Sequence, residues 1–103
     1  MLSITDKISF RQRQILIHSY LYYHRDNNII SDKEYDKLSY GLAEMIKQYP
    51  NEFMGSEYFI HFVDWTPATG FDLYDRLDES EKYRVQNIAD YLCRGRKYET
   101  NKK

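Results

Sequence analysis

The feature that most constrains the fold is a strong helix start at Ser31, which follows a long helical pattern. Ser31 and Glu34 have the spacing of a capping box, and acidic residues fill the first turn, where the helix dipole favours them. Pro50 is a usual helix stop. The apolar stripe between them has helical spacing and comprises Tyr35, Leu38, Leu42, Met45 and Tyr49. The pattern therefore predicts a helix that ends at Tyr49.

The preceding residues predict a partner for this helix. Residues 8–25 contain no Gly or Pro, and Leu16, Tyr20 and Tyr23 follow one another at i, i+4 and i+7. Residues 26–28 read Asp-Asn-Asn, a turn signal, because Asn and Asp tolerate left-handed backbone conformations. We therefore expect an αα-hairpin with a loop of about five residues.

The second half of the chain predicts shorter elements and one long helix. Ser56 as an N-cap favours a short helix over residues 58–63, although so short an apolar run also fits a strand. Residues 65–70 read as a loop, and residues 71–77 as one or two helical turns. Asp78-x-x-Glu81, followed by apolar residues at helical spacing, predicts a helix from Glu79 to Arg94. Residues 97–103 form a basic tail that we expect to fray.

The length of 103 residues leaves room for one hydrophobic core, so we expect one helical domain over residues 1–96. The first fifty residues would form its hairpin, and a second helical half would extend over residues 53–96. Aromatic residues make up 17% of the chain, which argues against disorder. The predicted fold class is all-α: a Tyr-rich antiparallel hairpin packed on a C-terminal helix, with short helices between them.

Composition excludes several classes of function. A net charge of −1 suits neither a basic nucleic-acid binder nor an acidic DNA mimic, so we expect no direct nucleic-acid contact. No apolar run approaches the ~18 residues of a membrane span, and no secretory signal is visible. Cys93 is the single cysteine, and with three histidines it makes no thiolate metal site. A reducing, cytoplasmic location fits best. No nucleophile–base pair or Gly-rich phosphate loop indicates an enzyme.

One cluster of polar and aromatic residues has the chemistry of a binding site. In an antiparallel hairpin, the end of the first helix lies beside the start of the second, so these residues would converge: Tyr22, Tyr23, Asp32, Tyr35 and Asp36. Carboxylates accept hydrogen bonds from a ribose diol, and two tyrosine rings could sandwich a flat cationic ring such as nicotinamide. The same residues also fit a plain hairpin, with tyrosines in the core and aspartates that only start a helix.

The cluster resembles a known domain. Residues 18–23 (His-Ser-Tyr-Leu-Tyr-Tyr) and residues 30–38 (Ile-Ser-Asp-Lys-Glu-Tyr-Asp-Lys-Leu) are similar to the N-terminal Ia domain of bacterial NAD-dependent DNA ligases. The family pattern is H-x-Y-x-Y-[HY], a short loop, then I-x-D-x-E-Y-D-x-L. The resemblance covers residues 11–52. It implies a small helical module that recognises the nicotinamide mononucleotide (NMN) half of NAD, with its binding residues at the five positions of the cluster.

The sequence also departs from those ligases. The K-x-D-G motif of their adenylation domain does not occur, and residues 53–103 match no part of the ligase. We therefore expect no ligation by this chain, and weak binding of NMN or NAD at best.

Two classes of function remain open. The first is a non-catalytic module that binds a nicotinamide nucleotide. The second is a protein inhibitor from a phage or mobile element that blocks a host defence system, for example an anti-CRISPR, and keeps the hairpin as a scaffold. Its host-protein partner would contact the aromatic and acidic residues of the second half: Tyr58, Phe62, Trp65, Phe71, Asp72 and Asp75.

Overall fold

The computed structural model describes residues 2–27, 29–68 and 72–94, and all regular secondary structure in these ranges is helical. The predicted all-α class is confirmed. The elements are α1 (Ile4–His24), α2 (Asp32–Gln48), α3 (Pro50–Met54), α4 (Phe59–Phe62), the 3₁₀ helix η1 (Tyr74–Arg76) and α5 (Glu79–Arg94).

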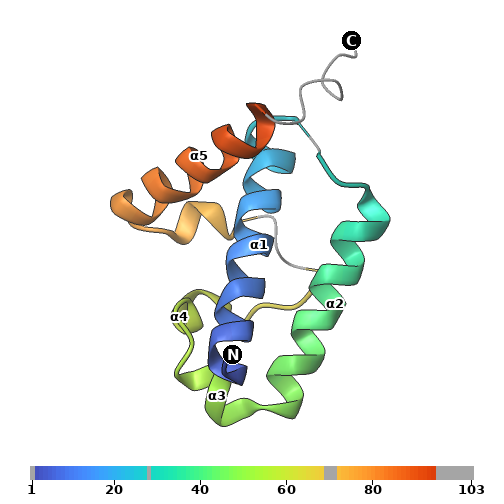
Figure 1. Cartoon of the computed structure of the whole chain (residues 1–103), viewed down its shortest axis with the longest axis vertical. Helices are drawn as coiled ribbons and strands as arrows, with labels where there is room; N and C mark the ends of the chain where they lie inside the picture. Colours follow the sequence, from blue (N-terminus) through green and yellow to red (C-terminus); the bar gives the residue numbers. More distant parts are fainter. Residues whose placement is uncertain (1, 28, 69–71, 95–103) are drawn as a thin grey trace.

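The first helix is the centre of the fold. In Figure 1, α1 runs between α2 on one side and α5 on the other, with α3 and α4 near its N-terminal end. α1 contacts α2, α3, α5 and η1. Because it is covered from several directions, its buried residues are not confined to one stripe: Ile8, Gln12, Ile15, Leu16, Ile17, Ser19, Tyr20 and Leu21. The expected apolar row is wrong at its last residue, because Tyr23 is 49% exposed. The neighbouring Tyr22 is also exposed, at 45%.

Side-chain caps define the helix starts. The predicted box at the start of α2 is present, with the Glu34 amide donating to Ser31 Oγ at 3.1 Å. α5 begins in the same way, because the Glu81 amide donates to Asp78 Oδ1 at 2.8 Å. α1 begins at Ile4 rather than at the expected residue 8, because Ser3 and Asp6 form a capping box that opens the helix earlier.

The segments between the long helices differ in part from the prediction. The loop of the hairpin spans residues 25–31 and is longer than expected. Pro50 does not only stop a helix, since it also opens α3 as the first residue of that helix. The short helix expected near residues 58–63 is confirmed as α4. The one or two helical turns expected over residues 71–77 take the form of the single 3₁₀ turn η1, and residue 71 lies outside the described residues. The expected basic tail, residues 97–103, lies outside the described residues.

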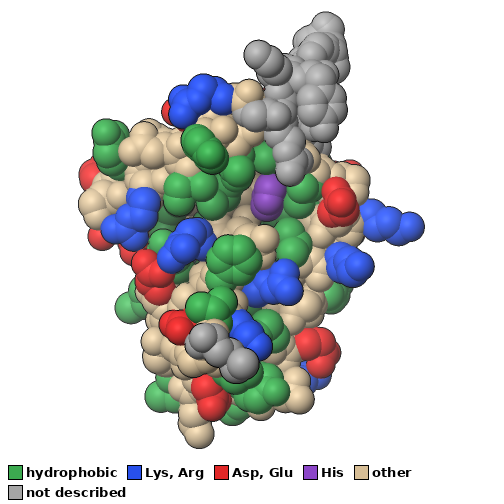
Figure 2. Space-filling view, viewed as in Figure 1, with side chains coloured by type: hydrophobic (Ala, Val, Ile, Leu, Met, Phe, Trp, Pro, Cys, Tyr) green, Lys and Arg blue, Asp and Glu red, His purple; other side chains and the backbone are tan. Residues whose placement is uncertain are grey.

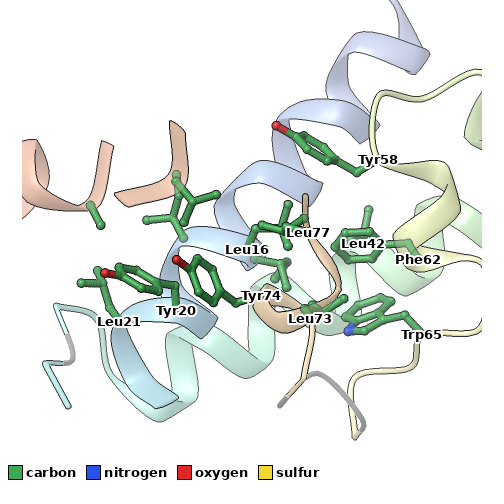
Figure 3. Close-up of a cluster of buried hydrophobic side chains, with 14 of the residues drawn as sticks. Leu16, Tyr20, Leu21, Leu42, Tyr58, Phe62, Trp65, Leu73, Tyr74 and Leu77 are labelled. Atoms are coloured by element: carbon green, nitrogen blue, oxygen red, sulfur yellow. The ribbon is translucent and has the colours of Figure 1, made fainter. Parts of the chain in front are cut away.

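The hydrophobic core joins the hairpin to the second half of the chain. Figure 3 shows Leu16 of α1 and Leu42 of α2 close to Phe62, Leu73 and Leu77. All five are at most 4% exposed. The Phe62 and Trp65 rings meet at a centroid distance of 5.1 Å and an interplanar angle of 64°. The second half therefore supplies part of the core that the hairpin needs.

A buried polar network also connects the two halves. Gln12 of α1 is fully buried. Its Nε2 donates to Ser56 Oγ at 2.9 Å, and its Oε1 accepts the Tyr58 amide at 3.1 Å. Ser56 Oγ in turn donates to the Phe53 carbonyl oxygen at 2.6 Å. One glutamine thus satisfies buried polar groups of a segment 44 and 46 residues away in sequence.

Gln12→Ala is expected to lower the free energy of unfolding by about 1–3 kcal/mol, because the Tyr58 amide would remain buried without an acceptor. Urea denaturation followed by circular dichroism measures the change. Gln48→Ala, at the exposed end of α2, is the control and is expected to change stability by less than about 0.5 kcal/mol. Equal effects of the two substitutions would contradict a structural role for the network.

Candidate functional site: a pocket between the two hairpin helices

A pocket of about 240 Å³ lies where the C-terminal end of α1 meets the N-terminal end of α2. Its lining includes all five residues that the sequence singled out, from both helices of the hairpin. The lining residues are His18, Tyr22, Tyr23, Ile29, Ile30, Ser31, Asp32, Tyr35, Asp36 and Pro67. The hairpin therefore brings the cluster together on one concave surface.

The loop of the hairpin determines how the two helix ends face each other. Asp26 has a positive φ of 49°, the left-handed conformation expected of a turn aspartate. The Asn27 amide donates to the Leu21 carbonyl oxygen at 3.0 Å, which closes the end of α1. Asn27 Nδ2 also lies 3.2 Å from Cys93 Sγ, and Arg25 pairs with Asp90 at 2.9 Å. The loop is thus fixed to α5, and Ile29, only 6% exposed, anchors it in the core.

Two tyrosines of α1 form the exposed wall of the pocket. Tyr22 and Tyr23 are each about half exposed, and their rings meet edge to face with a centroid distance of 4.7 Å and an angle of 89°. Edge-to-face contact leaves a ring face available to another flat group. Exposed aromatic faces of this kind are suited to stacking on a ligand.

Tyr35 of α2 differs from the two exposed tyrosines of α1, because its side chain is half-buried and packs against the core. Burial raises the pKa of the Tyr35 phenol above its usual value, and a hydrogen bond with the Ser19 side chain opposes only part of that rise. The Asp36 carboxylate raises the same pKa further. Tyr35 therefore stays neutral at physiological pH and keeps its phenolic proton for hydrogen bonding.

Carboxylates carry the charge of the pocket. Asp32 lies in the first turn of α2 and Asp36 one turn later, so both side chains lie on the same face of the helix. Among the described lining residues there is no lysine or arginine. The nearest lysines in sequence, Lys33 and Lys37, are exposed on α2, and neither lines this pocket. The pocket thus offers hydrogen-bond acceptors and negative charge.

Five lining residues were not among the candidate site residues from the sequence: His18, Ile29, Ile30, Ser31 and Pro67. His18 precedes Tyr22 by one helical turn, so helical spacing was a signal that could have found it. Ile30 flanks the capping box and belongs to the same loop. Pro67 comes from the second half of the chain, and nothing in the local sequence indicates that it returns to the hairpin.

The expected protein-binding surface of the second half is wrong in its aromatic part. Tyr58, Phe62 and Trp65 are 2%, 1% and 8% exposed, and all three point into the core (Figure 3). They are buried because α4 and the segment after it cover α1 and α2 with their apolar side chains. Phe71, also predicted at this surface, lies outside the described residues.

The acidic residues of the same segment make local ion pairs. Arg76 lies 2.9 Å from Asp64 and 3.5 Å from Asp72, and its hydrogen bond lowers the pKa of Asp64. Asp75 lies 3.5 Å from His24 of α1. On the face seen in Figure 2, acidic and basic side chains are interspersed with hydrophobic ones. Asp72 and Asp75 therefore have intramolecular partners, which leaves little support for a surface that steers a basic protein.

Two other features are absent from the described ranges. No three His, Cys, Asp or Glu side chains come together there in a way that would hold a metal ion. None of the helices in those ranges is both long and apolar enough to cross a membrane.

Comparison with known proteins identifies the hairpin. No curated protein and no solved structure shows a significant match to the chain. A family model described as "DNA ligase-like, N-terminal NAD+-binding domain" matches residues 1–55, which include α1, α2 and nine of the ten pocket residues. Because this match covers more than half of the chain, the protein belongs to the DNA ligase-like, N-terminal NAD⁺-binding domain family.

Proposed function

We propose that the protein is a non-catalytic module that binds the nicotinamide mononucleotide part of a nicotinamide nucleotide in the pocket between α1 and α2. One observation carries the proposal. The five residues that the resemblance to the ligase domain implies as binding residues line a single pocket. Their roles follow from the chemistry of their side chains.

The tyrosines would hold the nicotinamide ring. Oxidised nicotinamide is flat and positively charged, and a cation over a tyrosine face gains about 0.5–2 kcal/mol. Tyr22 offers an exposed face from α1, and Tyr35 offers a half-buried one from α2. Because Tyr35 packs against the core, its ring is already ordered and little conformational entropy is lost on binding.

The aspartates would hold the ribose. Asp32 and Asp36 line the pocket one helical turn apart and present carboxylate oxygens, which accept hydrogen bonds from hydroxyl groups. A hydrogen bond to a charged acceptor is stronger than one between neutral groups, and contributes about 1.5–3 kcal/mol. Together with the charge of the pyridinium ring, this favours the oxidised nucleotide.

Titration of the purified protein with NMN tests the proposal. Half of the Tyr22 and Tyr23 surface faces water, so we expect a weak dissociation constant of about 0.1–1 mM, equivalent to roughly −4 to −5.5 kcal/mol. Calorimetry measures the affinity, and backbone amide NMR shifts map the site to the pocket residues. Adenosine monophosphate, which lacks the cationic ring, is the control and should not bind. Absence of NMN binding at several millimolar would refute the function.

A further inference from the structure

One wall of the pocket between α1 and α2 does not come from the hairpin. Pro67 lies beyond residues 1–55, which match the NAD⁺-binding family, and its half-buried side chain lines the pocket. The other nine lining residues belong to α1, to α2 and to the loop that joins them. Figure 1 shows the chain after α4 crossing from α1 to α2. Because two helices that lie side by side enclose a groove from two sides only, this segment supplies a third side.

The hydrophobic core fixes the position of this third side. Trp65, two residues before Pro67, is 8% exposed, and its ring meets the ring of Phe62 at a centroid distance of 5.1 Å. The Trp65 amide also donates to the Phe62 carbonyl oxygen at 3.2 Å. Both rings belong to the cluster that contains Leu16 of α1 and Leu42 of α2. The segment that carries Pro67 and the two helices of the hairpin therefore share one core.

The backbone around Pro67 is also held by local contacts. The Ala68 amide donates to Thr66 Oγ1 at 3.3 Å, which closes a turn around Pro67. The pyrrolidine ring fixes the φ angle of Pro67 and restricts the backbone of the residue before it. Arg76 of η1 donates to the Asp64 carboxylate at 2.9 Å, which ties the start of this segment to the chain that follows it. Pro67 is therefore in place before a ligand binds, and little conformational entropy is lost on contact.

A proline side chain suits this position chemically. It adds apolar surface that excludes water, and it has no amide N–H that needs a hydrogen-bond partner. A cation on a tyrosine face and a hydrogen bond to a carboxylate are both stronger where water is excluded. In the proposed function, tyrosines hold the nicotinamide ring and aspartates hold the ribose. Water exclusion by Pro67 strengthens both kinds of contact.

We propose that Pro67 is a ligand-contacting residue, through which the second half of the chain completes the nicotinamide-nucleotide site that the hairpin leaves open on one side. This inference rests on the proposed function and adds to it a binding residue outside the family match. It also gives the burial of Phe62 and Trp65 a consequence for binding, because the core contacts of these residues position Pro67.

NMR of the full chain with ¹³C-labelled proline tests the contact directly. The chain has two prolines, and Pro50, at the start of α3, does not line the pocket, so it is an internal control. On titration with NMN, we expect the ring signals of Pro67 to shift and its ring protons to show nuclear Overhauser effects to the nicotinamide protons, while the Pro50 signals stay in place. Shifts of the α1 and α2 pocket residues without a Pro67 contact would overturn the inference and leave the proposed function intact. Absence of any shift at several millimolar NMN would overturn both.

Substitutions at Pro67 test whether the contact contributes to affinity. Pro67→Gly removes the apolar ring and is expected to weaken NMN binding about three- to tenfold, as measured by calorimetry. Pro67→Val keeps an apolar side chain without the locked backbone, and should bind within about twofold of the unsubstituted chain. Val63→Ala is the control, because Val63 lies on the same segment, is 59% exposed and does not line the pocket.

The fluorescence of Trp65, the single tryptophan of the chain, checks that the segment stays in place, and its emission maximum should be the same in all variants. Unchanged NMN affinity of Pro67→Gly would overturn the inference. Equal loss of affinity in Pro67→Gly and Pro67→Val would also overturn it, because the locked backbone and not the apolar surface would then be the cause.

Discussion

Phe62→Ala is expected to lower the free energy of unfolding by about 3–5 kcal/mol. Phe62 is 1% exposed, stacks edge to face on Trp65, and lies in the core cluster with Leu16 and Leu42 of the hairpin. Truncation would remove the apolar surface of the ring and leave a cavity between elements that cannot collapse fully. Since domains of this size are stable by only about 5–15 kcal/mol, the loss is a large fraction of the total. Urea denaturation followed by circular dichroism measures it.

The control for this substitution lies on the same short helix. Ile60 of α4 is 74% exposed, so Ile60→Ala is expected to change stability by less than about 0.5 kcal/mol. The pair also separates two interpretations of the second half of the chain. A surface aromatic that contacts a partner protein would tolerate truncation in the isolated protein, whereas a core aromatic would not. A stability of Phe62→Ala equal to that of the unsubstituted protein would restore the interpretation as an interface.

The long helices were predictable because their signals are local. The capping pairs Ser31–Glu34 and Asp78–Glu81 both form in the structure, as their spacing of three residues predicted. The pocket is also largely a local feature, since a hairpin must place the end of α1 beside the start of α2. Ser3 and Asp6 form the same kind of pair, so α1 begins at Ile4 and not at the expected residue 8.

The burial of the second half was not predictable because it depends on contacts between residues distant in sequence. Tyr58, Phe62 and Trp65 lie on short segments with no helical stripe, so their pattern does not distinguish a core from a binding surface. What buries them is the core cluster that they share with Leu16 of α1 and Leu42 of α2. Pro67 reaches the pocket for the same reason, since the chain returns to the hairpin after α4.

Asp36→Ala and Tyr35→Ala are each expected to weaken NMN binding about 5–150-fold, which corresponds to about 1–3 kcal/mol. Asp36→Ala removes a charged acceptor for the ribose, and Tyr35→Ala removes an aromatic face for the ring. Calorimetry of each variant with NMN measures the loss. Asp36 is exposed and lies outside the capping box of α2, so its substitution should leave the fold intact. Tyr35 packs against the core, so its variant also requires a check by circular dichroism.

Asp36→Ala is therefore the more informative of the two substitutions, and Glu44→Ala is its matched control. Both residues are exposed acids of α2, but Glu44 does not line the pocket. Loss of one negative charge from α2 is common to both variants, so any general effect of charge on a cationic ring appears in both. A specific contact with the ribose requires that Asp36→Ala weakens binding while Glu44→Ala does not. Equal weakening in both variants would reduce the role of Asp36 to a diffuse electrostatic one and would place the ribose elsewhere.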